Sequence, residues 1–302
     1  MKKSLAKQIW SKRGLFLLML LPIMWYIVFK YIPMYGVQLA FRRYNPSLGI
    51  TKSPWVGLKY FKQFFNSYYF KDILWNTVSL SLYQLVVGFP LPIILALMIN
   101  EVHSRKYQKF VQNVTYIPHF LSVVVVVSML NLFCDPTYGI FNKFLGLFGV
   151  AAVDYMAKPG AFQTLYVFSN VWQNMGFNAI IYIAVLSSLD QDMYEAATID
   201  GCSRFKQVLY ISLPALVPTI MTLLVMRLGS IMNVGFEKVL LMQNPVNMSK
   251  SNIIATFVYT NGIQKGEFSY STAIGLFNSL INFILLFTTN RLSKKLTGSG
   301  LW

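Results

Sequence analysis

The 302-residue sequence is 55% hydrophobic and only 12% charged. Because a soluble domain usually carries about 25% charged residues, this composition excludes an ordinary soluble protein and indicates a polytopic membrane protein. The formal net charge of +16 could suggest a nucleic acid partner. The basic residues are instead scattered in short loops between lipid-compatible apolar runs. We therefore expect them to meet membrane lipid headgroups, and we expect no nucleic acid partner.

Six apolar runs along the chain have a length, about 17 to 25 residues or more, that suits helices crossing a bilayer. In chain order they are Gly14–Phe29 (extending to about Ile32), Ile73–Asn100, Phe110–Cys134, Pro159–Leu189, Gln207–Gly235 and Phe268–Asn290. Prolines inside the second, third and fifth runs predict kinks. With no internal repeat and no linker, the sequence predicts an all-α fold of six transmembrane helices in a single domain, residues 1–302.

The basic residues leave the orientation of these helices nearly undecided. The basic cluster at residues 2–13 favours a cytoplasmic N-terminus, whereas the basic residues of segment 30–71 would then lie outside. Six spans would put both termini on one side of the membrane.

An amphipathic stretch follows the first run, at residues 57–70, and reads GLKYFKQFFNSYYF. It places Phe61, Phe64, Phe65 and Tyr68 on one helical stripe, with lysines off that stripe. This pattern is typical of a helix lying in the headgroup layer on the extracellular side. It is equally typical of an amphipathic helix packed against the bundle, and the sequence supports both interpretations.

Catalytic motifs are absent from the sequence. It contains no G-x-x-x-x-G-K-[ST], no G-x-S-x-G, no H-E-x-x-H and no paired-cysteine motif, so we expect no catalytic residue, no metal site and no ATP hydrolysis by this chain. We expect structural roles for His103 and His119. Ion-coupled carriers usually place acids or histidines within the membrane. Here Arg227 is the clear charge within a predicted span, which disfavours a secondary carrier.

Neutral polar side chains occupy the predicted spans instead. They are Asn76, Gln84, Asn113, Asn131, Gln173, Asn174, Asn178, Asn233, Asn278 and Asn282. Amides can bond sugar hydroxyls and aromatic rings can stack on sugar faces. The candidate substrate contacts are Trp172, Asn174, Asn178, Tyr182 and Asn233. For any single amide, hydrogen bonding between helices is the commoner role.

The segment at residues 194–218 reads YEAATIDGCSRFKQVLYISLPALVP, and four of the chain's 10 acidic residues lie within Asp190–Asp200. Asp190 is suited to cap a helix, acids in its first turn complement the helix dipole, and Gly201 is suited to end it. Ser203 can cap a second helix, and two prolines can begin the next span. The segment therefore predicts two short helices that meet at a glycine bend and project from the membrane.

This segment resembles the EAA loop of ABC importer permeases. The resemblance lies in Glu195, Ala196, Ala197, Asp200, Gly201, Ile211, Leu213, Pro214 and Pro218, in the pattern E-A-A-x-x-D-G-x(9)-I-x-L-P-x(3)-P. Cys202 stands where the family commonly has alanine. The resemblance implies a type I permease fold in which residues 187–214 form a coupling loop that inserts into a groove of a separate cytoplasmic ATPase. It assigns the coupling contacts to Glu195, Ala196, Ala197, Asp200, Gly201, Phe205, Leu213 and Pro214, and it makes the loop and both termini cytoplasmic.

A second resemblance concerns the substrate. The stretches YIPMYGVQLAFRRYNP and SPWVGLKYF, with NPVNMSKSNIIATFVYTNGI and YSTAIGLFNS near the C-terminus, are similar to those of class 1 carbohydrate-uptake permeases. The similarity is greatest to the branch that imports oligosaccharides derived from polysaccharides. It implies a multi-pass protein of a prokaryotic cell membrane that carries no cofactor itself.

The same resemblance implies the partners of the chain. They are a homologous second permease, a cytoplasmic ATPase dimer that binds ATP and Mg, an extracellular substrate-binding protein and an oligosaccharide. Two alternatives stay open at this point. One is the same machinery importing another solute, such as a peptide or a phosphate ester. The other is an ion-coupled secondary carrier that works alone.

Overall fold

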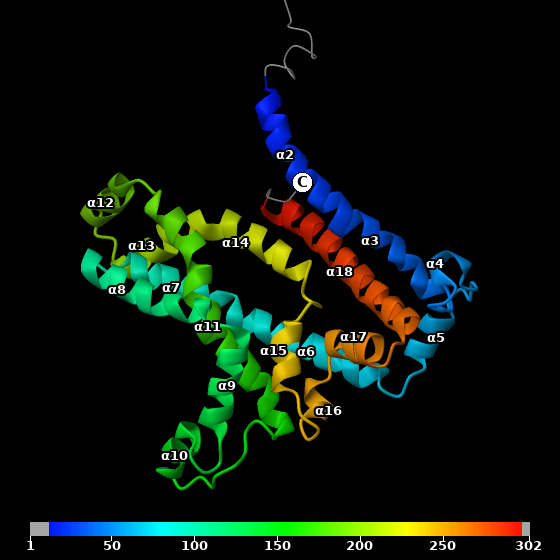
Figure 1. The fold of residues 1–302 in the computed structure, drawn as a ribbon. Helices are drawn as coiled ribbons and strands as arrows, with labels where there is room; N and C mark the ends of the chain where they lie inside the picture. The colour runs from blue at the N-terminus through cyan, green and yellow to red at the C-terminus, as the bar shows by residue number, and fades with distance from the viewer. Residues whose placement is uncertain (1–11, 298–302) are drawn as a thin grey trace, which may run out of the picture. The chain divides into compact units, whose positions relative to one another are not determined.

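The structure, a computed structural model, describes residues 12–297 (Figure 1). Over these residues the chain folds into helices, and its extended pairing is confined to an antiparallel bridge between Arg42 and Trp55. The predicted all-α fold is confirmed for this part of the chain. The basic residues Lys2, Lys3 and Lys7, and the chain termini, lie outside the described residues.

The described chain divides into two compact units. The first contains residues 12–67 and 258–277, and the second contains residues 68–257 and 278–297. The helices of the first unit are α2 (Arg13–Tyr26), α3 (Ile32–Met34), α4 (Gly49–Lys52), α5 (Lys59–Phe65) and the start of α18 (Phe268–Thr297). From α2 onward, π-helical and 3₁₀ turns continue the helix without a break to Phe41. No side chain of α2 is buried, which suits an apolar helix that faces lipid.

The amphipathic stretch of the first unit is shorter than its sequence pattern suggests, because α5 ends at Phe65. Phe64 is only 1% exposed and packs edge-to-face against Tyr270 and Phe277, at ring distances of 6.4 and 5.7 Å. Phe65 is 46% exposed. This packing favours the interpretation of α5 as a helix held against its own unit over that of a free headgroup helix.

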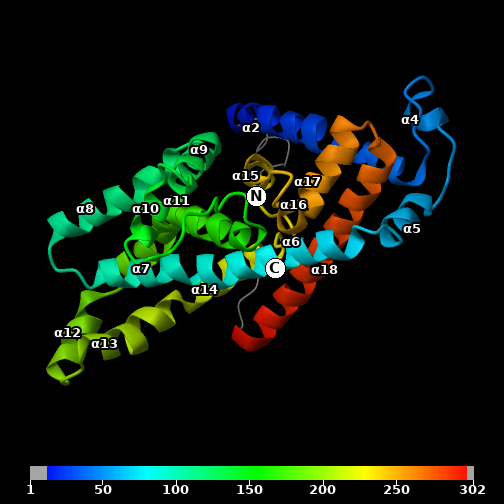
Figure 2. The ribbon, with the colours of Figure 1, turned by 90° about the horizontal axis from the view of Figure 1, so that it is seen from below.

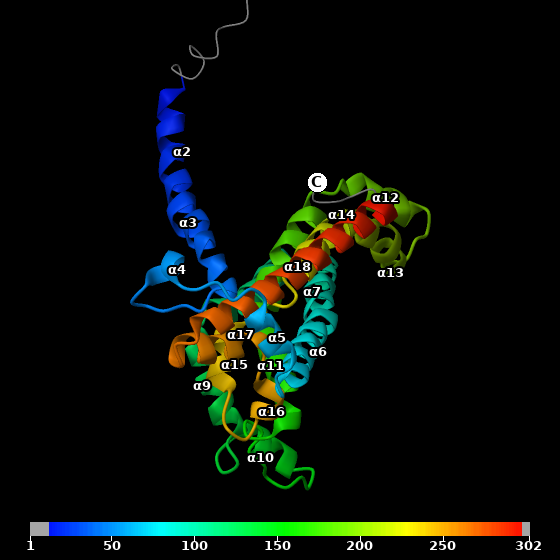
Figure 3. The same cartoon turned by 90° about the vertical axis from the view of Figure 1, so that its right-hand side faces the viewer.

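The second unit holds the remaining helices. They are α6 (Phe70–Gly88), α7 (Pro90–Asn100), α8 (Arg105–Tyr116), α9 (Val123–Cys134), α10 (Ile140–Gly146), α11 (Pro159–Ser187), α12 (Gln191–Ile199), α13 (Arg204–Gln207), α14 (Leu213–Leu228), α15 (Phe236–Met242), α16 (Met248–Ser251) and most of α17 (Ile254–Tyr259). The 29-residue helix α11 is central to this unit and packs against α6, α7, α8, α9, α14 and α16 (Figures 2 and 3). At about 1.5 Å per residue it is roughly 43 Å long. The loop containing α10 and the helix α12 therefore lie at opposite ends of α11.

Within the described residues, four helices are long and apolar enough to cross a membrane. They are Arg13–Phe41, Phe70–Asn100, Arg204–Leu228 and Phe268–Lys295, and the bent pair Arg105–Phe120 and Val123–Cys134 makes five if it counts as one span. These helices correspond to five of the six predicted runs. The remaining run is α11, whose amide side chains lower its mean hydropathy. The sixth span stays a prediction.

The third predicted run is not a simply kinked helix, because α8 and α9 meet at an angle of 99°. Pro118 lacks an amide hydrogen, and the chain leaves the helical conformation at Leu121 and Ser122. Ser122 then caps α9, its side chain accepting from the amide of Val125 at 3.3 Å. The carbonyl of Leu121 accepts from the Gln173 side chain of α11 at 2.9 Å. Gln173, predicted among the neutral polar residues of the spans, thus stabilises the break between α8 and α9.

The start of the fifth span also differs from prediction. A second short helix ending before Pro214 was predicted, but α13, a π-helical turn at Val208–Ser212 and α14 form one continuous helix, Arg204–Leu228. Pro214 lies inside this continuous helix, just after the π-helical turn, and the widened turn accommodates its missing amide hydrogen without interrupting the helix. The span also ends earlier than predicted, at Leu228 rather than Gly235.

One glycine allows the closest helix approach in the second unit. Gly176 of α11 is buried, and a Cβ there would overlap the backbone of Thr115 in α8. We predict that Gly176→Leu separates these helices and lowers the free energy of unfolding by about 1–3 kcal/mol or more. The thermal unfolding midpoint of the purified protein would measure this loss.

The matched control is Gly160→Leu in the first turn of the same helix, where a Cβ would meet nothing within 4 Å. Its midpoint should stay close to that of the wild type. Equal losses in the two variants would contradict the close-approach explanation.

Candidate functional site

The first candidate site is the loop around α12. Asp190 adopts an extended conformation before α12 and its carboxylate accepts from the amide of Asp192 at 3.1 Å, as predicted for an N-cap. Asp192 lies in the first turn, where a negative charge is stabilised by the helix dipole. The predicted start of this helix is confirmed.

The end of α12 is fixed by a glycine turn. Gly201 has φ of +76°, a conformation that residues with a Cβ rarely adopt. The amide of Gly201 donates to the carbonyl of Thr198 at 3.0 Å, and that of Cys202 donates to Ala197 at 2.8 Å. These two bonds form a Schellman motif, which satisfies the last carbonyls of the helix. The predicted glycine stop is confirmed, whereas Ser203 makes no side-chain cap to α13.

Side chains tie the short helix α12 to the start of the next long helix. The hydroxyls of Tyr194 and Ser212 lie 2.9 Å apart, and the Gln207 amide donates to the Thr198 hydroxyl at 2.9 Å. A helix of nine residues is not stable alone, so it depends on such contacts. A further contact joins Arg204 to His103, whose Nε2 lies 3.0 Å from the guanidinium. His103 thus has a structural contact, as expected.

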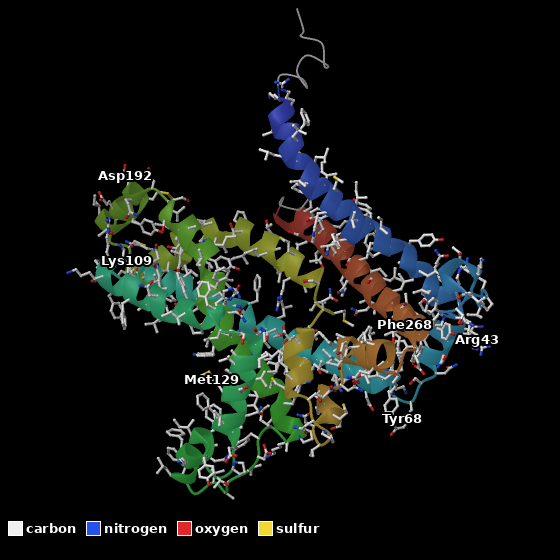
Figure 4. The ribbon with its side chains drawn as sticks, viewed as in Figure 1. Arg43, Tyr68, Lys109, Met129, Asp192 and Phe268 are labelled. Carbon is white, nitrogen blue, oxygen red and sulfur yellow. The ribbon has the colours of Figure 1, made fainter. Side chains whose placement is uncertain are left out.

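The loop exposes a mixed acidic and apolar surface at the end of the unit where α8 begins (Figure 1). The side chains of Asp192 and Lys109 project outward there (Figure 4). Glu195, Ala196 and Asp200 are exposed, Ala197 is half-buried, and Ile199 and Phe205 are 86% and 77% exposed. Leu213 is half-buried and Pro214 exposed at the start of α14. Apolar side chains exposed this fully on a short helical projection are typical of a protein-docking surface.

The second candidate site is a pair of adjoining cavities inside the second unit, with volumes of about 560 and 680 Å³. Both are lined by Gln84, Asn170, Asn174 and Arg227. The smaller cavity lies between residues of α6, α7, α11 and α14. The larger one reaches the break between α8 and α9 and the segment between α14 and α15. Volumes of about 300–1,000 Å³ are usual for small-molecule sites.

The structure brings four of the five candidate substrate contacts to these cavities. Asn174, Asn178 and Tyr182 line the smaller cavity, and Asn174 and Asn233 line the larger one. Trp172 lines neither and is 47% exposed. Its place on the opposite side of α11 from these amides could have been found from helical spacing.

Hydrogen bonds within the protein already engage two of these amides. Asn174 contacts Nδ1 of His119 at 2.9 Å, and the His119 ring stacks on Phe177 with centroids 3.8 Å apart. Asn233 accepts from the amides of Asn278 and Asn282 at 3.0 and 3.1 Å. Asn178 makes no side-chain hydrogen bond to the described residues. It is therefore the amide among these with most free capacity for a ligand.

A non-helical segment at residues 229–235 forms one wall of the larger cavity. The amide of Met232 donates to the side-chain oxygen of Asn282, and that of Gly235 donates to the Tyr166 hydroxyl, both at 3.1 Å. A Cβ at Gly235 would lie 2.8 Å from that hydroxyl, so a small residue is needed there. Irregular backbone at membrane depth is tolerated where protein groups satisfy it or where it lines a cavity.

Charged groups of the larger cavity include residues that were not selected from the sequence. Arg227, Glu237 and Lys238 line it. Lys238 is only 5% exposed. Its amine has no hydrogen-bond partner in the part of the chain that the structure describes, and it lies 5.7 Å from the centre of the Tyr166 ring. Burial lowers the pKa of Lys238 to about 8. Little in the sequence pointed to this lysine, because it lies in a loop region between two predicted spans.

The cavity chemistry suits a polar organic solute. Amides and hydroxyls can donate and accept, and the cationic groups can attract an anion. Among the described residues, no group of three or more His, Cys, Asp or Glu side chains could hold a metal ion.

Comparison with known proteins places these features in context. Residues 88–298 match the family described as binding-protein-dependent transport system inner membrane component. Protein LplB of Bacillus subtilis (strain 168) is 41% identical over 290 residues, covering 96% of this chain and 91% of LplB. The polygalacturonan/rhamnogalacturonan transport system permease protein YteP of the same organism is 38% identical over 301 residues, covering 100% of this chain and 94% of YteP.

A solved structure is similar over nearly the whole chain. It is the crystal structure of a bacterial alginate ABC transporter in complex with alginate pentasaccharide-bound periplasmic protein. One of its chains has a TM-score of 0.91 and 37% identity, covering 99% of this chain and 100% of that chain.

We predict that Gly201→Ala strains the turn after α12 and frays the last turn of that helix. A Cβ at φ of +76° costs about 1–2 kcal/mol. The amide hydrogens of residues 201 and 202 should exchange faster in the variant than in the wild type, and hydrogen-exchange measurements would detect this fraying. Gly201→Asn is the control, since asparagine tolerates this conformation better than alanine. If both variants exchange at the wild-type rate, the turn does not depend on the glycine.

Proposed function

The chain belongs to the family of binding-protein-dependent transport system inner membrane components, and we propose that it is the permease subunit of an ATP-driven importer of oligosaccharides. In this proposal an extracellular binding protein delivers the sugar, and a separate cytoplasmic ATPase supplies the energy. The main observation that supports this proposal is that α12 is exposed, with Glu195 and Ala196 on its surface and the glycine turn at its end.

The proposed coupling residues are those of the EAA pattern. Glu195 would pair with a basic residue of the ATPase, and the small side chains of Ala196 and Ala197 would permit close docking. Asp200 and Gly201 would form the bend, and Phe205 would fill an apolar pocket of the ATPase. Leu213 and Pro214 lie within the long helix Arg204–Leu228, to which the loop is tied. The exposure of Glu195 and Phe205 supports these roles.

The proposed topology has six spans and cytoplasmic termini. It counts the bent pair α8–α9 as one span and α11 as another, and it takes the amides of α11 as facing the cavity instead of lipid. With α12 cytoplasmic, the loop at the other end of α11, which contains α10, would lie outside. That loop and segments 32–72 and 236–267 would then receive the binding protein.

The proposed substrate path is the pair of cavities. Asn174, Asn178, Tyr182 and Asn233 line it, and Trp172 would contact sugar only outside these two cavities. The sugar assignment draws support from the names of YteP and of the alginate transporter, both of which concern polysaccharide-derived sugars.

The proposed cycle follows from the way the loop is attached. ATP-driven closure of the ATPase would move α12, and the ties to Ser212 and Gln207 would pass this movement to the helix Arg204–Leu228. That helix ends at the cavity wall, so its movement would open the cavity to one side or the other. ATP and Mg belong to the partner, and this chain would carry no cofactor.

We predict that Glu195→Lys abolishes both the stimulated ATPase activity and sugar uptake, because it reverses the charge at the docking surface. The assay is a complete complex in proteoliposomes, with second permease, ATPase and binding protein. Glu195→Gln is the matched variant and should retain part of the activity, since it removes the charge without reversing it.

Membrane insertion and expression of Glu195→Lys should equal those of the wild type. Unchanged uptake in this variant would refute the docking role. Uptake by the chain alone, driven by an ion gradient and indifferent to ATP, would refute the importer and support a secondary carrier.

A further inference from the structure

Lys238 is the buried cation of the larger cavity. It lies in α15, whose next residue, Val239, belongs to the apolar core. Its side chain is 5% exposed, and the amine finds no hydrogen-bond partner among residues 12–297. Burying an unpaired ammonium group is costly, and proteins keep such groups mainly where they serve a purpose.

The charged neighbours of Lys238 do not neutralise it. Glu237 lines the same cavity, but adjacent residues of a helix point in different directions, and the Lys238 amine bonds to none of the described residues. Arg227 adds a second cation to the same wall. The ring of Tyr166 attracts the amine only weakly at 5.7 Å. The cavity therefore has two cations and one carboxylate, with one cation fully desolvated and unpaired.

The remaining lining of the cavity suits a sugar. Asn170, Asn174 and Asn233 offer amides, and Ser230 offers a hydroxyl. A neutral sugar would satisfy these groups and could accept a hydrogen bond from the Lys238 amine, but it would leave the charge of that amine uncompensated. A sugar that carries a carboxylate would satisfy both, because charge-assisted hydrogen bonds to carboxylates are the stronger ones.

We propose that Lys238, with Arg227 in the lining of the same cavity, binds a carboxylate of the transported sugar, so that the substrates are acidic, uronate-containing oligosaccharides. This inference rests on the proposed function, because it assigns a substrate class to the same cavity. The names of two similar proteins agree with it, since polygalacturonan and alginate are polymers of uronic acids.

The test uses the complete transporter in proteoliposomes, with its second permease, ATPase and binding protein. Short oligosaccharides from polygalacturonate and alginate are offered together with short neutral oligosaccharides from arabinan and amylose. Mass spectrometry then identifies which sugars enter in an ATP-dependent manner. We expect uronate oligosaccharides inside. ATP-dependent entry of neutral sugars alone would overturn the inference and leave the proposed function standing. If no sugar enters, the proposed function itself fails.

Three variants test whether the Lys238 amine determines the affinity for uronate oligosaccharides. Lys238→Met should raise the KM for the imported uronate oligosaccharide about tenfold or more, the usual effect of losing one hydrogen bond to a charged group. Lys238→Arg should keep most of the affinity, because it preserves the charge. Lys250→Met is the control, since Lys250 is exposed in α16 and outside the cavity. An unchanged KM in Lys238→Met would overturn the proposal.

Assembly of the complex is measured for each variant by size-exclusion chromatography. If Lys238→Met and Lys238→Arg both fail to assemble with the second permease, the amine serves a contact between subunits and the proposal is wrong. Equal losses of uptake for acidic and neutral sugars in Lys238→Met would also overturn it.

The pH dependence of uptake gives an independent readout. Burial lowers the pKa of Lys238 to about 8, and a bound carboxylate would raise it, because only the protonated amine attracts the anion. Affinity for uronates is therefore expected to be full below pH 8 and to fall as the pH rises through that value. Arginine stays protonated, so Lys238→Arg should lack this fall.

The other groups that face the cavity, Arg227, Glu237, His119 and Tyr166, are common to both proteins. At each pH, the ratio of the KM of the wild type to the KM of Lys238→Arg therefore reports on Lys238 alone. A ratio that does not change with pH would contradict the role of its amine.

Discussion

Backbone groups that are kept from water need hydrogen-bond partners within the protein, and this requirement governs the second unit. Two of the places where the chain leaves helical structure beside the central helix α11 are Leu121–Ser122 and residues 229–235. In each place a side chain from another helix completes the backbone. Gln173 reaches the carbonyl of Leu121, while Asn282 and Tyr166 receive the amides of Met232 and Gly235. Without these side chains, both breaks would leave unpaired groups in an apolar environment, which costs several kcal/mol per group.

The same requirement explains why the cavities lie where they do. Breaks in helices need polar side chains, and the larger cavity lies where the polar side chains of two neighbouring breaks gather. Helix α11 links this polar centre to the loop around α12, which follows its C-terminus. The loop is also tied through Tyr194 and Ser212 to the long helix that ends at the second break. A force on the loop thus acts on two walls of the cavity at once.

The sequence predicted the features that follow from local chemistry. Asp190 and Gly201 were identified as the ends of a helix because capping and a positive φ depend on single residue types. The 99° bend near Pro118 and the continuous helix through Pro214 were not predicted. In those places the outcome depends on contacts with distant residues, such as Gln173, and on whether the helix widens into a π-helical turn beside a proline. Lys238 was missed for a related reason, since a lysine between two spans normally meets water, and only tertiary packing buries it.

The two sites use charge in opposite ways, and under the proposed function this difference would separate energy supply from selectivity. The acids around α12 are exposed, so they retain their hydration and can attract a basic partner at little cost until docking occurs. The amine of Lys238 is already desolvated, so the cost of its burial was met when the protein folded. A carboxylate that enters the cavity would recover that cost, whereas a neutral sugar would leave the charge uncompensated. A site that leaves a buried polar group unpaired discriminates strongly against ligands that lack the complementary group. Selectivity for acidic sugars would then follow from a single lysine that the fold keeps dry, independent of how the loop receives its energy.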